Sequence, residues 1–229
     1  MMPVRGLINL PGDKSISHRA LMLSAFTGGE CIIHNLSTGK DVESTRYCLS
    51  QCGISSTKSS GKVRVKGGKF LPPQKSLNCG NSGTTMRLLA GLLAGQGIST
   101  KFRGDSSLTK RPMNRIIEPL TQMGVHFKSE AGCLPITMMT NPLVGISYCL
   151  PVASAQVKSA ILLAALGAEG KTIVIETIKT RDHTEIMLKE MGVDIQVNDE
   201  ITVRKLDHPL DEFEISIPGD PSSAAFFAV

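Results

Sequence analysis

Basic and hydroxyl side chains cluster just before an apolar run near the start of the chain, in the stretch PGDKSISHRALMLSAF. The apolar run predicts a helix that begins near Lys14, Ser15 and Arg19. The first turn of a helix exposes unpaired backbone N–H groups and a partial positive charge, which attract anions. Ser15 and Arg19 are four residues apart and would share one helix face. The cluster therefore predicts a site for a phosphate or carboxylate, which the Arg19 fork could bind with two hydrogen bonds.

A similar turn precedes three more apolar runs, beginning at Cys79, Pro151 and Pro218, so that successive turns are 68, 72 and 67 residues apart. The polar or small residues that these turns and two later helix starts offer are Asn81, Gly83, Ser154, Gln156, Arg111 and Arg181. A Ser or Asp before a helix is most often only a cap, so one such turn is ambiguous. Four turns with one period favour convergence on a shared anion site.

The repeat also predicts the architecture. The motifs LSQCGIS, LTQMGVH and LKEMGVD recur with nearly the same period, and each is expected to end a helix at its glycine, Gly53, Gly124 or Gly192. Each unit is interpreted as strand, helix, strand, helix, strand, strand. Three units that share one core predict an α/β (α+β layered) fold of βαβαββ repeats. In the second unit the second helix is expected to start at Pro112 and to be strained by Pro119.

The composition indicates an ordinary globular chain of 229 residues, with 41% hydrophobic and 20% charged residues. No apolar run reaches the roughly 18 residues of a membrane span and no signal-peptide pattern occurs, so no membrane association and a cytoplasmic location are expected. The net charge of +5 suits small anions, while the absence of Trp and the scarcity of Tyr and Phe argue against nucleic-acid binding. The six cysteines form no Cys-x-x-Cys pair, so they are interpreted as reduced core residues without zinc.

Three further polar side chains are interpreted as structural. Lys158, in the middle of an expected helix, is expected to reach solvent, and His18 is expected to be either a polar neighbour or a residue on a helix surface. His183, beside Asp182, favours a local turn hydrogen bond over an oriented base. The stretch ALGAEGKT resembles a phosphate-binding loop, but the expected helix precedes it and the strand follows it, so a nucleotide site is rejected.

Six motifs together resemble the 5-enolpyruvylshikimate-3-phosphate synthase family: PGDKSISHRA, GNSGTTMRLL, GDSSLTKRPM, PVASAQVKSAILLA, TRDHTE and PGDPSSAAF. They occur in order along essentially the whole chain. The resemblance implies the two-domain enolpyruvyl transferase fold, similar to an inside-out α/β barrel, in which this chain forms one domain. The related UDP-N-acetylglucosamine enolpyruvyl transferases share the repeats, but their opening motif lacks the Lys-Ser-x-Ser-x-Arg pattern.

The resemblance implies transfer of the enolpyruvyl group of phosphoenolpyruvate to the 5-hydroxyl of shikimate 3-phosphate, with release of phosphate, by a monomer without metal or organic cofactor. The residues then expected at shikimate 3-phosphate are Lys14, Ser15, Arg19, Ser154, Ala155, Gln156 and Arg181. Those expected at phosphoenolpyruvate are Lys14, Asn81, Gly83, Arg111 and Gln156. Lys14 would lie between both substrates as the catalytic residue. Because Ala at the position of Gly83 gives this family tolerance to the herbicide glyphosate, the glycine implies a sensitive form.

The resemblance also predicts the domain boundaries. Residues 12–217 would form the substrate-binding domain, with units at about 12–78, 79–149 and 150–217. Residues 1–11, with a strand at about 5–10, and residues 218–229 would belong to a second, largely absent domain, and the two PGD segments would be hinges.

In the family the acid/base carboxylates come from that second domain. The chain is therefore expected to be an N-terminal half with little activity alone, which a separate C-terminal half could complete. The alternative function is a non-catalytic anion-binding module, which would show binding without turnover. A nucleic-acid binder would instead show a strong dependence on salt.

Overall fold

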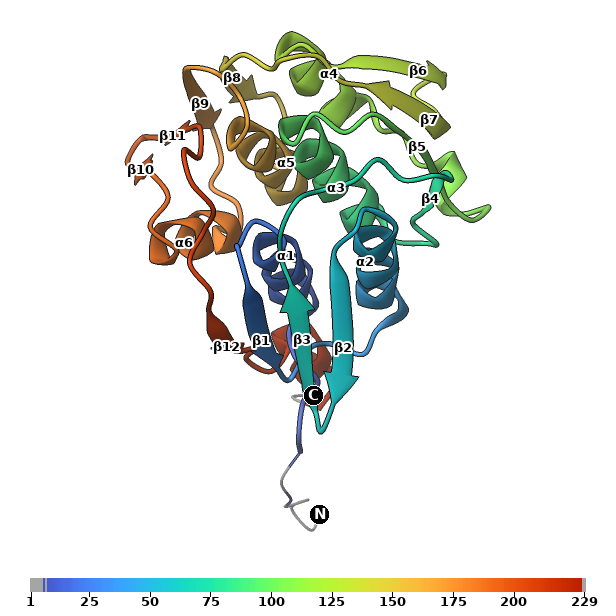
Figure 1. Ribbon diagram of the computed structural model, residues 1–229, viewed down its shortest axis with the longest axis vertical. Helices are drawn as coiled ribbons and strands as arrows, with labels where there is room; N and C mark the ends of the chain where they lie inside the picture. Colours follow the sequence, from blue (N-terminus) through green and yellow to red (C-terminus); the bar gives the residue numbers. More distant parts are fainter. Residues whose placement is uncertain (1–5, 7, 228–229) are drawn as a thin grey trace.

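The computed structural model describes residue 6 and residues 8–227. The described residues form three four-stranded sheets, and three helices, α1, α3 and α5, lie centrally among them (Figure 1). The expected α/β fold of three repeats is thus confirmed. Over the described ranges the sheets remain separate and do not close into one barrel.

The first unit contains two helices and three strands: α1 (Lys14–Ser24), β1 (Glu30–His34), α2 (Lys40–Gln51), β2 (Ser55–Ser59) and β3 (Lys62–Lys66). Strand β1 pairs antiparallel with β3, and β3 pairs antiparallel with β2. The fourth strand of this sheet is β12 (Glu214–Ser216), which follows the third unit and runs parallel to β1. The repeat pattern did not predict this long-range pairing. The strand expected at about residues 5–10 lies partly outside the described residues, and residues 8–10 form no strand.

The second and third units each show the expected order of strand, helix, strand, helix, strand, strand. The second consists of β4 (Leu77–Asn78), α3 (Gly83–Gly95), β5 (Thr100–Arg103), the 3-10 turn η1 (Leu108–Lys110), α4 (Asn114–Gln122), β6 (His126–Glu130) and β7 (Cys133–Met139). The third consists of β8 (Ser147–Leu150), α5 (Ala155–Ala165), β9 (Lys171–Glu176), α6 (His183–Glu190), β10 (Ile195–Val197) and β11 (Glu200–Arg204). A short helix, α7 (Pro221–Ala224), and the turn η2 (Ala225–Phe227) follow β12.

The glycines expected at the helix ends are confirmed. Gly53, Gly124 and Gly192 have φ values of 87°, 113° and 77°, in the left-handed region that only glycine adopts easily. Each follows a second helix of its unit, so the same local signal ends α2, α4 and α6.

Helix α4 differs from its expected form in two ways. It starts at Asn114 rather than Pro112, because the Met113 carbonyl already accepts the hydrogen bonds that begin the helix. Pro119 is accommodated inside the helix, where it is buried with Ile116 and Leu120. Packing against the core therefore offsets the cost of the missing N–H group.

The core is built around α1, α3 and α5, whose apolar side chains are buried on nearly every side. Full burial of one Leu or Ile contributes about 1.5–3 kcal/mol, so three such helices account for much of the stability. One recess, at the C-terminal ends of the three helices, is lined by the residues just after their last turns: Ala25, Gln96 and Leu166. The three helices therefore run in the same direction, and their N-termini lie together at the opposite end.

The cysteine expectation is only partly right. All six thiols are free, and Cys31, Cys48, Cys52 and Cys79 are buried, but Cys149 is exposed because it points outward from β8. Burial raises the pKa of Cys52 to about 12, which keeps this thiol protonated and unreactive.

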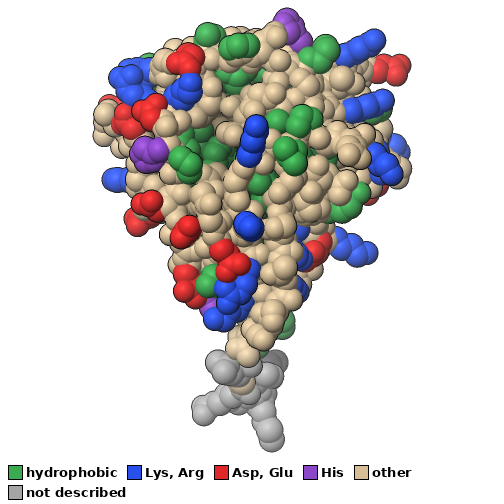
Figure 2. Space-filling view, viewed as in Figure 1, with side chains coloured by type: hydrophobic (Ala, Val, Ile, Leu, Met, Phe, Trp, Pro, Cys, Tyr) green, Lys and Arg blue, Asp and Glu red, His purple; other side chains and the backbone are tan. Residues whose placement is uncertain are grey.

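On the face drawn in Figure 2, Lys and Arg side chains are mixed with Asp and Glu rather than gathered in one basic patch. That face lacks the basic surface typical of nucleic-acid binders. None of the helices in the described ranges has the length and apolar character that crossing a bilayer requires.

Candidate anion-binding site

The N-termini of α1, α3 and α5 are each capped by the residue that precedes them. The Asp13 carboxylate accepts a hydrogen bond from the Ile16 N–H at 2.8 Å, and the Ser82 hydroxyl accepts one from Thr85 at 3.1 Å. The Ser154 hydroxyl accepts a longer one from Val157, at 3.4 Å. Each cap satisfies only one of the four unpaired N–H groups of a first turn, so the others can still face a bound anion.

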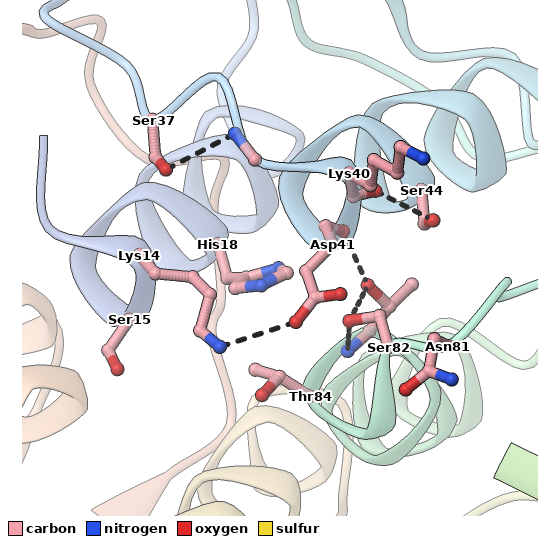
Figure 3. A network of polar contacts seen from close by, with 12 residues as sticks. Lys14, Ser15, His18, Ser37, Lys40, Asp41, Ser44, Asn81, Ser82 and Thr84 are labelled. Atoms are coloured by element: carbon pink, nitrogen blue, oxygen red, sulfur yellow. Dashed lines mark hydrogen bonds and ion pairs between the residues drawn. The ribbon is translucent and has the colours of Figure 1, made fainter. Parts of the chain in front are cut away.

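Lys14 and Ser15 lie at the start of α1, beside a recess of about 460 Å³. Arg181, in the loop before α6, also lines this recess and donates a hydrogen bond to the Ser15 hydroxyl at 3.4 Å. The Lys14 ammonium extends to Asp41 of α2, with 3.3 Å between Nζ and Oδ2 (Figure 3). Asp220, from the fourth turn, lines the same recess, so the first and fourth turns do meet as the repeat predicted.

A second group of predicted residues lies around the start of α3. The Asn81 amide donates to Asp105 at 2.7 Å, and the Arg111 guanidinium donates to the Asn81 carbonyl oxygen at 2.6 Å. A Cβ atom at Gly83 would lie 2.6 Å from Nη1 of Arg87 and 3.5 Å from Nη1 of Arg111. The glycine therefore leaves room for two guanidinium groups near the first turn of α3.

Gln156, in the first turn of α5, joins α5 to α3. Its side-chain oxygen accepts a hydrogen bond from Arg87 at 2.8 Å, and its amide nitrogen donates to the Thr84 hydroxyl at 2.9 Å. Burial, followed by the charges of Arg111 and Arg115, lowers the pKa of the Arg87 guanidinium. Arg87 and Arg111 are thus two cations beside the first turn of α3, and a bound anion would reduce the repulsion between them.

Arg19 is buried in the structure and links three helices. Its Nε donates to the Thr184 hydroxyl at 2.7 Å, Nη1 to the Ser15 carbonyl at 2.9 Å and Nη2 to the Ser159 hydroxyl at 2.6 Å. Burial lowers the pKa of Arg19 to about 10, an effect that Glu185 opposes. A guanidinium has five N–H donors. Three of those on Arg19 donate to the groups just named, so two have no partner among the described residues.

The expectation for Lys158 is wrong. Its side chain is completely buried, and its ammonium lies 2.8 Å from Oε2 of Glu176 and 2.5 Å from Oε1 of Glu185. The reason is tertiary: α5 is an interior helix that packs against α3, α4, β9 and β11, so its middle residues are buried.

The surface alternative for His18 and the turn hydrogen bond expected for His183 are also wrong. His18 is buried rather than on a helix surface, and its Nδ1 lies 2.7 Å from the Thr45 hydroxyl of α2. Nδ1 of His183 is buried and has no hydrogen-bond partner in the described part of the chain, so it makes no local turn bond.

Burial of His18 predicts a distinct response to pH. Burial and the nearby charges of Lys14 and Arg19 lower the pKa of His18 to about 3. An unfolded imidazole takes up a proton near pH 6.5, so below this pH the unfolded chain binds more protons than the folded chain. The contribution of His18 to stability is therefore complete above about pH 6.5 and is lost as the pH falls toward 3.

An NMR titration of the folded chain measures this directly. The His18 ring signals are expected to stay constant from about pH 8 to about pH 4.5, while the same ring in the urea-unfolded chain titrates near its ordinary pKa of about 6.5. A folded-state midpoint near that ordinary value would show that the ring is accessible to water.

Several polar residues of the site were not predicted from the sequence. Arg87 lies four residues after Gly83 in the same motif, and the one-turn spacing of a helix could have placed both on one face. Thr84 is adjacent to Gly83. Asp41 had no local signal, because it reaches the site only through the packing of α2 against α1. The described residues bring together no set of three or more His, Cys, Asp or Glu side chains that could hold a metal ion.

The comparisons with known proteins agree on one family. A family model described as EPSP synthase (3-phosphoshikimate 1-carboxyvinyltransferase) matches residues 1–229. The 3-phosphoshikimate 1-carboxyvinyltransferases of Novosphingobium aromaticivorans and Thermotoga neapolitana are each 48% identical, over 99% of this chain and 54% of the relative. A solved EPSP synthase from Acinetobacter baumannii is similar with a TM-score of 0.90 and 42% identity, over 97% of this chain and 52% of that structure.

The chain thus spans about half the length of the curated relatives that it matches. The match extends over its entire sequence, and the fold agrees with that of a solved member. The chain belongs to the EPSP synthase family.

Proposed function

We propose that this chain is the substrate-binding half of an enzyme that transfers the enolpyruvyl group of phosphoenolpyruvate to the 5-hydroxyl of shikimate 3-phosphate. The relatives' names support the reaction. The observation with the greatest weight is that the starts of α1, α3 and α5 meet with Lys14, Arg87, Arg111 and Arg181 on one side of the domain. Two multiply charged anions require this combination of N–H groups and cations.

The two groups of residues suggest two neighbouring binding places. We assign shikimate 3-phosphate to Lys14, Ser15, Arg19, Ser154, Ala155, Gln156 and Arg181. We assign phosphoenolpyruvate to Lys14, Asn81, Gly83, Arg111 and Gln156. Gln156 bonds to both Arg87 and Thr84 of α3 while belonging to α5, which supports its place between the two groups.

In the proposed reaction the 5-hydroxyl oxygen loses its proton and bonds to the central carbon of phosphoenolpyruvate, while the methylene carbon of the double bond takes up a proton. The resulting tetrahedral intermediate then loses phosphate, together with a proton from the carbon that had taken one up, which restores the double bond. Lys14, as the catalytic residue, would lie beside both substrates, and the surrounding cations would stabilise the negative charge of the departing phosphate. We propose that the acid/base carboxylates lie outside these residues and that no metal or organic cofactor takes part. Because Gly83 carries no side chain beside the Arg87 and Arg111 guanidinium groups, we propose that the site is of the glyphosate-sensitive type.

We propose residues 12–217 as the substrate-binding domain and the two PGD segments as its hinges. These segments lie side by side: the Asp13 N–H donates to the Pro218 carbonyl at 2.8 Å, and the Asp220 N–H donates to the Pro11 carbonyl at 2.9 Å. Because these two segments are hydrogen-bonded to each other, they could bend together as one hinge. This supports closure of a second domain over the site. The enzyme would act as a cytoplasmic monomer.

Calorimetric titration with shikimate 3-phosphate tests the proposal. The wild-type chain is expected to bind one equivalent, and Arg181→Ala is expected to weaken binding about tenfold, because it removes one charged hydrogen-bond donor. The control is Arg204→Ala on β11, where an exposed arginine pairs with Asp194.

The outcomes test the anion site and the absence of catalysis by this chain alone. Binding without phosphate release from added phosphoenolpyruvate supports a binding half, and phosphate release at the rate of an intact enzyme would contradict it. Absence of binding by the wild-type chain, or equal weakening by both variants, would contradict the proposed anion site.

A further inference from the structure

A buried ion triad lies next to the proposed anion site. The Lys158 ammonium of α5 lies between the carboxylates of Glu176, at the end of β9, and Glu185 of α6. The exposed fractions of these side chains are 1%, 10% and 3%, and all three line a small cavity of about 140 Å³. Burial raises the pKa of Glu185, and its interaction with Lys158 opposes the shift. Such groups are costly to bury and persist only where their geometry is tightly held.

One link between the triad and the site passes through sequence neighbours. Ser159 follows Lys158, and Thr184 precedes Glu185, and these two hydroxyls lie 2.7 Å apart. Both also accept hydrogen bonds from Arg19. The contact of Lys158 with Glu185 therefore joins α5 to α6 at the level where Arg19 inserts between them.

A second link passes through Glu176 to the loop that precedes α6. Oε2 of Glu176 faces Lys158, while Oε1 accepts hydrogen bonds from the Thr180 hydroxyl at 2.5 Å and the Thr180 N–H at 3.2 Å. Thr180 is directly followed by Arg181, which reaches Ser15 across the recess. The Glu176 carboxylate thus joins the Lys158 ammonium to Thr180, and Thr180 is adjacent to Arg181, a proposed substrate contact.

We propose that Lys158, Glu176 and Glu185 are positioning residues, and that this triad fixes Arg181 at the anion site by holding Thr180. The inference rests on the proposed function only for the identity of the anion. The ordering of the loop that contains Thr180 and Arg181 does not depend on that function. A triad that served only the stability of the fold would not need a carboxylate oxygen directed at Thr180.

The test uses a pair of substitutions at Thr180 that leaves all three ionic groups in place. Thr180→Val keeps the β-branched shape but removes the hydroxyl donor, whereas Thr180→Ser keeps the donor. Glu190→Gln, at the exposed end of α6, is the surface control. Each variant is measured for its unfolding midpoint, its affinity for shikimate 3-phosphate and the ¹⁵N relaxation of the amides of residues 180–182.

Thr180→Val is expected to weaken shikimate 3-phosphate binding about tenfold and to increase the mobility of the Arg181 amide, with little change in the unfolding midpoint. Thr180→Ser and Glu190→Gln are expected to match the wild type. A Thr180→Val chain with wild-type affinity and wild-type relaxation would overturn the inference, as would a Thr180→Ser chain that behaves like Thr180→Val.

The relaxation data separate this inference from the proposed function. If the wild-type chain does not bind shikimate 3-phosphate but Arg181 becomes mobile only in Thr180→Val, the anion assignment fails and the positioning role stands. If the wild-type chain binds and Arg181 stays ordered in Thr180→Val, the positioning role fails.

Discussion

Lys158→Met is expected to lower the free energy of unfolding by about 3–5 kcal/mol, because it leaves two buried carboxylates without their shared cation. Glu176 and Glu185, whose side chains are only 10% and 3% exposed, would then share a poorly solvated site without a counterion. Urea denaturation at neutral pH measures the change. The double variant Lys158→Met/Glu185→Leu removes a charge of each sign and is expected to recover most of the loss.

Lys205→Met is the matched control for this prediction. Lys205 also pairs with a glutamate, Glu169, but both side chains are largely exposed. Removal of an exposed pair is expected to cost less than about 1 kcal/mol. Equal losses in Lys158→Met and Lys205→Met would show that the Lys158 cluster is open to water.

Arg19→Lys is expected to weaken shikimate 3-phosphate binding by about 100-fold. The lysine keeps the positive charge, but one ammonium cannot reach Ser15, Ser159 and Thr184 and still present two parallel donors to a phosphate. Loss of two charge-assisted hydrogen bonds, at about 1.5 kcal/mol each, gives this factor. Calorimetric titration with shikimate 3-phosphate measures it.

The control for this substitution is Arg46→Lys on α2. Arg46 is also partly buried and also bonds through its fork, to Glu43 and Ser56, but it lies away from the recess. Its replacement is expected to leave the affinity unchanged. If Arg19→Lys binds as well as the wild type, the fork of Arg19 does not contact the substrate.

The fold was predictable wherever its signals are local. Helix-ending glycines and polar turns before apolar runs depend on a few neighbouring residues, and they recur with one period, so the three units could be recognised. The pairing of β12 with β1 joins Glu214 to Ile32, far apart along the chain, and no local pattern encodes it. Helix α4 begins at Asn114, two residues after the expected Pro112, because the first carbonyl that accepts helical hydrogen bonds is that of Met113.

The candidate site was predictable in the same way, in part. Lys14, Gly83 and Gln156 occur in the first turns of helices, where the chemistry of an anion site is visible in the sequence. The environments of Lys158 and His18 were not predictable, because their burial depends on which elements pack around α5 and α1. A mid-helix lysine looks the same in sequence whether its helix is interior or at the surface.

We propose that the N-terminal turns of α1, α3 and α5 bind the anionic substrates. The most direct measurement is the ¹⁵N–¹H spectrum of the labelled chain during titration with shikimate 3-phosphate. The largest shifts of amide signals are expected at residues 14–16, 155–156 and 181, with smaller ones at 83–85. Absence of shifts, or shifts gathered at the opposite helix ends around residues 25–28, 96 and 206–209, would contradict it.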